Sequence, residues 1–179
     1  MGGYAFLEGI KKNTNTYSLI MDRAFFPYGK KDYDFLYKRT IFLCKYLLDL
    51  HVDEIIIACN TLSIMVLDDI KKLFSIKITG VIELLDLNID NALFMGTTNT
   101  INALKPTYKS LDYFDGRELI ALIQNNKHKE IKDYMKKNRN LFNSYQYVIL
   151  GCTHFIKIKH MFKNHISQDE EFMKRYSAL

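Results

Sequence analysis

The sequence predicts an α/β fold built on mainly parallel sheets flanked by helices. Short, continuously apolar segments alternate along the chain with longer segments of helical periodicity, a pattern typical of strands buried between helices. Two of the apolar segments, "IIIAC" and "YVILGC", end in a cysteine that a threonine follows within two residues. Only two prolines occur in the 179 residues, and no Gly/Ser-rich linker separates the segments. We therefore expect closely connected α/β units.

The individual elements follow from periodicity and from turn residues. We expect strands at 17–22, 53–58, 77–82, 91–98 and 145–151, with a weak strand and turn at 110–116. We expect helices at 4–12, 32–50 and 62–74, from about 99, from 117 to about 142, and from about 155. The segment "FPYGKK" at 26–31 has the composition of a turn.

The composition of the chain argues against nucleic-acid and membrane partners. The net charge of +5 comes mostly from scattered lysines, and the Lys-rich segment 126–140 also contains Glu130 and Asp133. This segment is typical of a solvated helix face, and no nucleic-acid-binding motif supports the alternative of a nucleic-acid surface. The first residues lack the apolar core of a secretory signal, and no run approaches the roughly 18 apolar residues of a membrane helix. We expect a cytoplasmic protein without a nucleic-acid or membrane partner.

The cysteines and histidines do not have the spacing of a metal site. None of the three cysteines forms a C-x-x-C pair, and a reducing cytoplasm disfavours disulfides. Cys44 lies among apolar residues at helical spacing, which indicates core packing. Four histidines show no metal-ligand spacing with carboxylates and are expected to be structural or exposed: His51, His128, His160 and His165. We expect no metal.

The other two thiols, Cys59 and Cys152, each follow a strand and precede a helical segment. In a parallel sheet this is the carboxyl edge, where ligands bind. The start of a helix would lower a thiol pKa toward neutrality, and the N–H groups of residues 60, 61, 153 and 154 could hold a carboxylate. We therefore expect a cleft with a thiol on each wall.

Other interpretations of these thiols remain open. A buried cysteine at a strand end is often only a small apolar side chain. A cysteine protease would need one nucleophile with a His and an Asn or Asp partner. Two cysteines in matched contexts favour two equivalent bases instead. Bases on opposite faces of one carbon are what stereoinversion requires.

Several motifs resemble those of one enzyme family. "ACNT" at 58–61 and "LGCTHF" at 150–155 resemble the two signature motifs of the aspartate/glutamate racemase superfamily. "FPYG" at 26–29, preceded by Asp22, is similar to the substrate loop of glutamate racemases in particular. "GVIE" at 80–83 and "GTTNT" at 96–100 match that family in order and approximate spacing. The resemblance covers nearly the whole chain.

The resemblance implies a cofactor-independent racemase with two pseudo-symmetric α/β lobes and the active site between them. Cys59 would take the α-proton of D-glutamate and Cys152 that of L-glutamate, with His154 assisting Cys152. The substrate's ammonium and carboxylates would be held by Asn60, Thr61, Thr97, Thr100 and Thr153. The loop around the bound amino acid would be shaped by Pro27, Tyr28 and Gly29. The resemblance also implies a homodimer and a supply of D-glutamate for peptidoglycan.

The chain departs from the family pattern in three places. "MGG" matches only the end of the family's opening Asp-Ser-Gly-x-Gly-Gly segment, and Gln124 falls where some members have a supporting Glu. The family's C-terminal return segment is present only at its start. We therefore expect a first lobe at 1–84 that lacks its first strand and its return segment. A second lobe, with the start of the return segment, is expected at 85–179.

Two alternative functions follow from these departures. The chain could be a remnant that only binds an acidic amino acid, or it could racemise aspartate or another small acid. Assays of D-glutamate and D-aspartate formation separate the two racemases, and binding without turnover would indicate the remnant.

Overall fold

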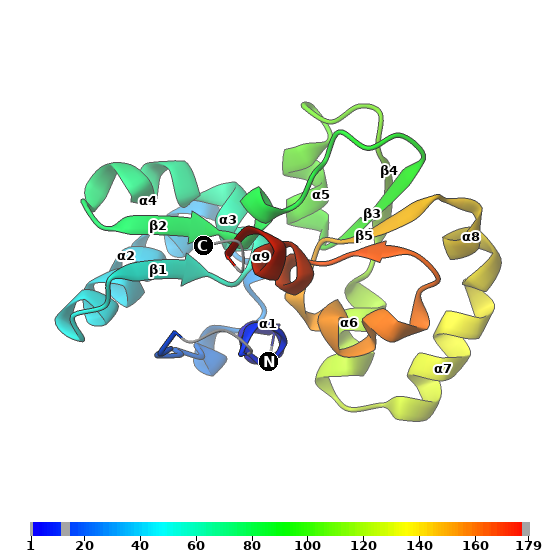
Figure 1. Cartoon of the computed structure of the whole chain (residues 1–179), viewed down its shortest axis with the longest axis horizontal. Coiled ribbons are helices and arrows are strands. Elements are labelled where there is room, and N and C mark those ends of the chain that lie inside the picture. Colours follow the sequence, from blue (N-terminus) through cyan, green and yellow to red (C-terminus); the bar gives the residue numbers. More distant parts are fainter. Residues whose placement is uncertain (1, 12–14, 177–179) are drawn as a thin grey trace.

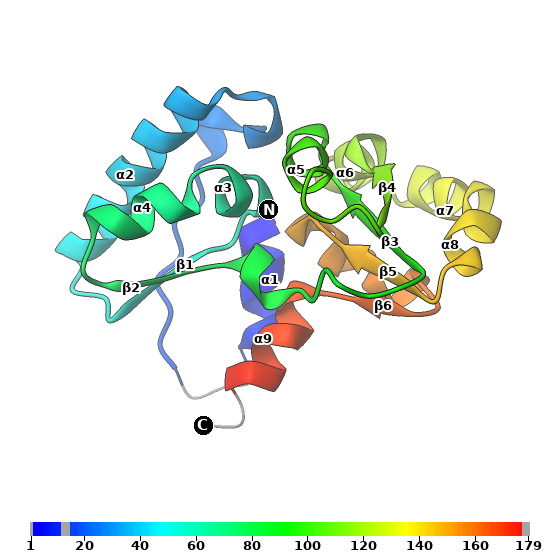
Figure 2. The same cartoon turned by 90° about the horizontal axis from the view of Figure 1, so that it is seen from above.

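The computed structural model describes residues 2–11 and 15–176. Two parallel sheets lie toward opposite ends of the long axis, and both views place α1 (Gly2–Ile10) and α9 (Gln168–Tyr176) between them (Figures 1 and 2). All strand pairings in the described residues are parallel. The predicted α/β class with mainly parallel sheets flanked by helices is confirmed.

The first sheet consists of β1 (Glu54–Ile57) and β2 (Lys77–Gly80). Three helices cover one of its faces (Figure 2): α2 (Tyr33–Asp49), α3 (Asn60–Met65) and α4 (Leu67–Leu73). Helix α2 begins after Asp32, whose carboxylate accepts a hydrogen bond from the Phe35 amide at 2.8 Å, an N-cap. Cys44 lies in the core between α2 and the sheet and is 2% exposed, so its predicted packing role is confirmed.

The second sheet has the order β4-β3-β5-β6. Its strands are β3 (Ala92–Gly96), β4 (Asp112–Asp115), β5 (Tyr147–Leu150) and β6 (His165–Ile166). The central strands β3 and β5 are buried on both faces because helices cover both, which explains their continuous apolar sequences. The flanking elements are α5 (Thr98–Leu104), α6 (Arg117–Gln124), α7 (His128–Lys137), α8 (Arg139–Ser144) and the 3-10 helix η4 (Thr153–Met161).

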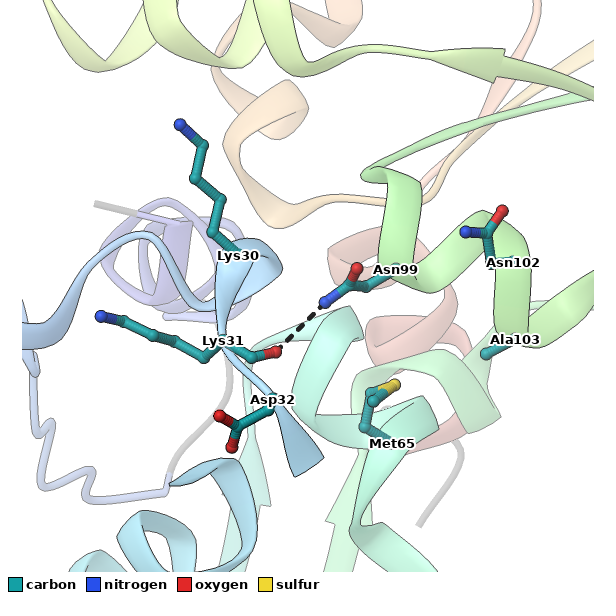
Figure 3. Close-up of a pocket in the computed structure, with 7 residues that line it drawn as sticks. All are labelled: Lys30, Lys31, Asp32, Met65, Asn99, Asn102 and Ala103. Carbon is teal, nitrogen blue, oxygen red and sulfur yellow. Dashed lines mark hydrogen bonds between the residues drawn. The ribbon is translucent and has the colours of Figure 1, made fainter. Parts of the chain in front are cut away.

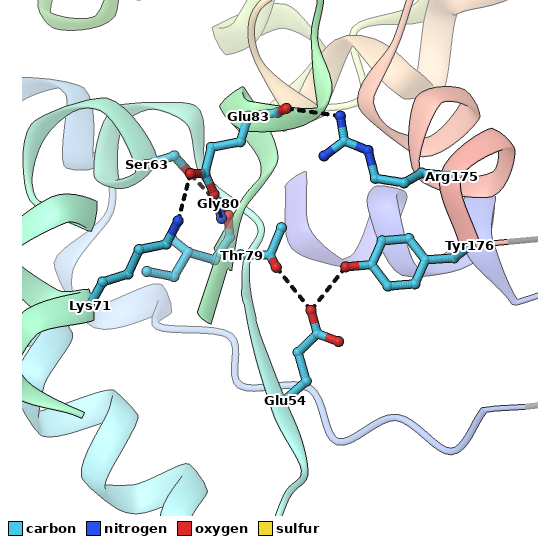
Figure 4. Close-up of polar contacts among 9 residues, drawn as sticks. Glu54, Ser63, Lys71, Thr79, Gly80, Glu83, Arg175 and Tyr176 are labelled. Carbon is cyan, nitrogen blue, oxygen red and sulfur yellow. Dashed lines mark hydrogen bonds and ion pairs between the residues drawn. The ribbon is translucent and has the colours of Figure 1, made fainter. Parts of the chain in front are cut away.

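Helix α9 connects the second sheet to the first. It follows β6 in sequence, and its end contacts β1 and β2 (Figure 4). The Tyr176 hydroxyl and Thr79 Oγ1 both donate to Glu54 Oε1, at 3.0 and 2.9 Å. Arg175 Nη2 donates at 3.2 Å to the carbonyl of Glu83, which lies in the short 3-10 helix η3 (Val81–Leu84). These contacts fix the position of α9 on the first sheet.

One predicted strand is wrong. Residues 17–22 have no regular secondary structure and run into the short 3-10 helices η1 (Arg23–Phe25) and η2 (Tyr28–Lys30). The segment "YSLIMD" has strand propensity, but Leu19 and Met21 are exposed and no strand in the described residues pairs with it. Strand propensity is expressed only where a ladder partner and a buried face are available.

Two other elements differ in detail. The helix predicted at 62–74 starts at Asn60 and breaks at the buried Val66, which separates α3 from α4. The helix predicted from about 155 is the 3-10 helix η4, and α9 follows it after β6, which is too short for its pattern to predict. The helices predicted from 117 to about 142 are α6, α7 and α8. The domain division at 84/85 stays a prediction.

Candidate active site

The two cysteine segments lie beside each other although their strands belong to different sheets. Cys59 follows β1 and precedes α3, and Cys152 follows β5 and precedes η4. Both residues have extended backbone, with φ of −140° and −149°. The Thr153 hydroxyl donates to the Ala58 carbonyl at 3.2 Å. This bond joins the residue after one cysteine to the residue before the other.

Burial controls the electrostatics of both thiols. Desolvation raises the pKa of Cys59, although hydrogen bonds from the Leu62 and Thr61 amides act in the opposite direction. Desolvation, and to a lesser extent a charge on Cys59, raise the pKa of Cys152 to about 12. The two thiols are therefore close enough to interact electrostatically.

The prediction that helix starts lower these thiol pKa values toward neutrality is wrong. Helix α3 has six residues and η4 is a 3-10 helix. Their amides do lower the pKa of each thiol, but by less than desolvation raises it. The cost of removing a thiolate from water outweighs a short row of peptide dipoles.

His154 connects Cys152 to Gln124. Its Nδ1 lies 3.4 Å from Cys152 Sγ, and its Nε2 lies 2.9 Å from Gln124 Oε1. The amide oxygen can only accept, so Nε2 carries the proton and Nδ1 presents a lone pair to the thiol. The His154 side chain is buried, and the ring of Phe26 packs on it with centroids 5.7 Å apart. Burial lowers the pKa of His154 from 6.5 to about 4.

This pKa shift predicts a stability that depends on pH. The unfolded chain protonates His154 below its ordinary pKa of 6.5, whereas the folded chain resists protonation until about pH 4. Stability is therefore full above pH 6.5 and falls as the pH drops through this window, by about 2 kcal/mol between pH 7 and pH 5. Urea unfolding at pH 7 and pH 5 measures the loss of stability. The part that His154 contributes should disappear in His154→Asn. It should persist in His128→Asn, a control at an exposed position; equal losses in both variants would contradict the assignment.

Hydroxyl groups from two helix starts form a cluster near Cys59. Thr61 Oγ1 lies 3.2 Å from Thr97 Oγ1 and 3.3 Å from Thr100 Oγ1, and the last two are 3.1 Å apart. Next to Thr61, the Asn60 side chain is 3% exposed, and neither of its amide atoms has a hydrogen-bond partner within the described residues. Because buried amides are normally paired, Asn60 has donor and acceptor capacity for a polar ligand.

The predicted substrate loop lies against both cysteine segments. The Tyr28 hydroxyl donates to Asp22. Burial and this bond raise the pKa of Tyr28, and a charge on Cys59 is a smaller cause in the same direction, so the ring lies near that thiol. A Cβ on Gly29 would lie 3.2 Å from Thr97 Oγ1, a close approach that explains the glycine. Pro27 accepts the Lys30 amide at 3.3 Å and starts the turn η2.

A pocket of about 580 Å³ lies on the outer side of this loop (Figure 3). Its lining residues come from the loop, α3 and α5: Lys30, Lys31, Asp32, Met65, Asn99, Asn102 and Ala103. Asn99 Nδ2 donates to the Lys31 carbonyl at 3.3 Å and so ties the loop to α5. Neither cysteine lines this pocket, which is therefore separate from the thiols.

Contacts thus connect most of the predicted site residues. Bonds, ring contacts or electrostatic interactions join Tyr28, Gly29, Cys59, Thr61, Thr97, Thr100, Cys152, Thr153 and His154. Asn60 and Pro27 adjoin this group along the chain. The individual catalytic and binding roles of all these residues stay predictions.

Two neighbouring residues were not predicted as part of the site. Gln124 contacts His154, and the only sequence signal was its alignment with a family Glu. Arg39 forms a bidentate ion pair with Asp22, at 2.8 Å for both bonds. Its position in the middle of an ordinary amphipathic helix gives no signal in the sequence.

Neither a membrane-spanning helix nor a cluster of metal-binding side chains occurs in the described part of the chain. In residues 2–11 and 15–176, no helix is long and apolar enough to cross a membrane. The same residues contain no group of three or more His, Cys, Asp or Glu side chains that could hold a metal ion.

Comparison with known proteins identifies the family. No protein-family model matches the chain. Glutamate racemase of Buchnera aphidicola subsp. Schizaphis graminum is 33% identical over 182 residues, which cover 89% of this chain and 71% of the relative.

Solved structures agree in fold. A glutamate racemase isoform of Bacillus anthracis matches with a TM-score of 0.81 at 22% identity, over 99% of this chain and 77% of that one. Glutamate racemase of Francisella tularensis, solved in complex with D-glutamate, matches with a TM-score of 0.79 at 23% identity, over 99% and 76%. The sequence identity to the Buchnera enzyme, over most of both chains, shows that this chain belongs to the glutamate racemase family of the aspartate/glutamate racemase superfamily.

Proposed function

We propose that this chain interconverts L- and D-glutamate, without a cofactor, by passing the α-proton between Cys59 and Cys152. The observation that carries this proposal is the meeting of two strand-end thiols from different sheets, close enough that a charge on Cys59 raises the pKa of Cys152. A bond between Thr153 and Ala58 holds their segments together. Two bases on opposite sides of one carbon give inversion, whereas one base returns the proton to the face it left.

Each proton and electron pair is accounted for. The Cys59 thiolate removes the α-proton of D-glutamate, and the electrons of the broken C–H bond spread into the α-carboxylate. The Cys152 thiol then delivers its proton to the opposite face of Cα, which forms L-glutamate and leaves Cys152 as the thiolate. L-Glutamate reacts by the reverse sequence.

The raised thiol pKa values suit this chemistry. A Cα–H next to a carboxylate is a very weak acid, so a more basic thiolate faces a smaller energy gap in proton transfer. The cost is a smaller population of thiolate. In the proposal, His154 assists Cys152 as a proton carrier across the 3.4 Å contact. Because burial lowers the pKa of His154 itself, Nδ1 carries this proton only in the course of the transfer.

The polar groups around the thiols would hold the substrate. We assign the ammonium and carboxylate contacts to Asn60, Thr61, Thr97, Thr100 and Thr153, with Pro27, Tyr28 and Gly29 enclosing the amino acid. The unpaired buried amide of Asn60 and the cluster of three hydroxyls support this assignment. Donors fixed in a desolvated site stabilise the charge that develops on the substrate carboxylate.

In the cell, we propose that the product D-glutamate serves peptidoglycan synthesis in the cytoplasm and that the enzyme acts as a homodimer. Expression of the chain should restore growth of a bacterial strain that requires D-glutamate. Continued dependence on added D-glutamate, with the protein present, would contradict this role.

The reaction is tested by incubating the purified chain with each enantiomer of glutamate and of aspartate and separating the products by chiral chromatography. We expect either enantiomer of glutamate to approach a racemic mixture, with aspartate unchanged. Faster formation of D-aspartate would assign a different substrate. Calorimetric binding of glutamate without turnover would contradict catalysis and support a role in binding alone.

A further inference from the structure

Both ends of the loop segment 22–28 are held by one carboxylate. Asp22 accepts two hydrogen bonds from Arg39, Nε to Oδ2 and Nη2 to Oδ1, each at 2.8 Å. The Tyr28 hydroxyl donates to the same Oδ2. The Asp22 and Arg39 side chains are only 9% and 24% exposed, so the pair is largely shielded from water and from salt.

Aromatic rings hold the Arg39 guanidinium in place. Its central carbon lies 4.6 Å from the ring centroid of Phe25, in the loop, and 4.8 Å from that of Phe42, one turn further along α2. Phe25 also packs on Phe35, with centroids 5.4 Å apart. Arg39 thus contacts the loop through both its charge and its flat faces.

The side of the loop away from Arg39 faces the candidate active site. The Phe26 ring packs on His154, and Gly29 lies against Thr97. The position of these two contacts depends on where the loop is held. The contacts described above hold the loop at Asp22, Phe25 and Tyr28. Arg39 also interacts directly with the Tyr28 side chain, at the far end of the 22–28 segment.

We propose that Arg39 is a positioning residue for glutamate binding: through Asp22 it fixes the 22–31 loop in the conformation that places Phe26 and Gly29 at the site. The proposal rests on the proposed function, because it takes this loop as the substrate loop. A loop held in its binding conformation before the ligand arrives saves the cost of ordering it, and a fractionally populated loop weakens apparent affinity by that fraction.

The test combines kinetics with hydrogen exchange in Arg39→Met, which keeps the aliphatic stem between the rings but removes the donors. We expect KM for glutamate to rise about 10-fold while kcat changes less than about 3-fold, since the loop acts on binding. Amide exchange in the free protein should become at least about 10-fold faster in 22–31 and stay unchanged in β3 and β5. Arg139→Met, at an exposed position on α8, is the matched control and should change neither quantity.

Two further variants keep the test decisive. Arg39→Lys keeps the charge but lacks the planar fork, so it should restore only part of the affinity. Asp22→Asn keeps the size of the side chain and should reproduce the effects of Arg39→Met, and the double variant should be no worse than either single one. If Arg39→Met does not fold, Asp22→Asn alone carries the test.

The outcomes separate this proposal from the proposed function. Parental KM and parental loop exchange in folded Arg39→Met or Asp22→Asn would overturn the positioning role. If the parent enzyme shows no turnover, the proposed function fails. Loop exchange, which needs no activity, still decides whether Arg39 fixes the loop.

Discussion

Replacement of either Cys59 or Cys152 by Ala is expected to abolish racemisation of glutamate, with a loss of at least about 10³-fold in both directions. Each thiol is proposed to serve one face of Cα, so the remaining thiol can remove and return a proton only on its own face. Chiral chromatography of reactions started from each enantiomer measures the loss.

Cys44→Ala is the matched control. Cys44 is buried in the core between α2 and the first sheet, within a helix and not at a strand end. This variant should lose some stability because it leaves a small cavity, and should keep turnover in the folded fraction. Near-parental racemisation by folded Cys59→Ala or Cys152→Ala would contradict the two-thiol account.

His154→Asn is expected to lower kcat/KM for glutamate by about 10²-fold or more, the usual scale for loss of a proton-transfer partner. The physical reason is the 3.4 Å contact between Nδ1 and the Cys152 sulfur, across which His154 is proposed to carry the proton during the transfer. Because L- and D-glutamate have equal free energies, kcat/KM must fall equally in both directions. Initial rates from each enantiomer measure it.

Gln124 provides an internal check on this role. Its oxygen keeps the proton on Nε2 of His154, so Gln124→Leu should lower activity only through that histidine. Its effect should therefore disappear in the His154→Asn background. His128→Asn should leave turnover unchanged. A His154→Asn enzyme with parental kcat/KM would contradict the relay.

Sequence patterns predicted the fold where burial and period agree. The short, continuously apolar segments around Ile55 and Ile149 predicted strands packed against helices. Both segments are such strands. The segment at 17–22 is also partly apolar and has strand propensity, but it is not a strand. Its outcome depends on whether another strand lies beside it, which a local pattern does not encode.

The candidate site was likewise predicted only where the signal is local in the sequence. Their positions at two matched strand ends marked Cys59 and Cys152, and the resemblance of "LGCTHF" to a family motif marked His154. Neither Arg39 nor Gln124 stands out locally, since each acts through a partner distant in sequence, Asp22 or His154. The thiol pKa values also went against prediction, because desolvation depends on the packing of the whole site, whereas the helix start is visible in the sequence.

The opposed positions of the two thiols are tested most directly by racemisation in heavy water. A thiol exchanges its proton rapidly with solvent, so the thiol that protonates the carbanion should deliver deuterium. We expect deuterium on Cα of the product enantiomer, with the remaining substrate largely unlabelled at early times, whether the reaction starts from L- or D-glutamate. Mass spectrometry of the separated enantiomers measures both. Equal initial rates of deuterium entry into substrate and product would indicate a single base and would contradict a mechanism with Cys59 and Cys152 on opposite faces of the substrate.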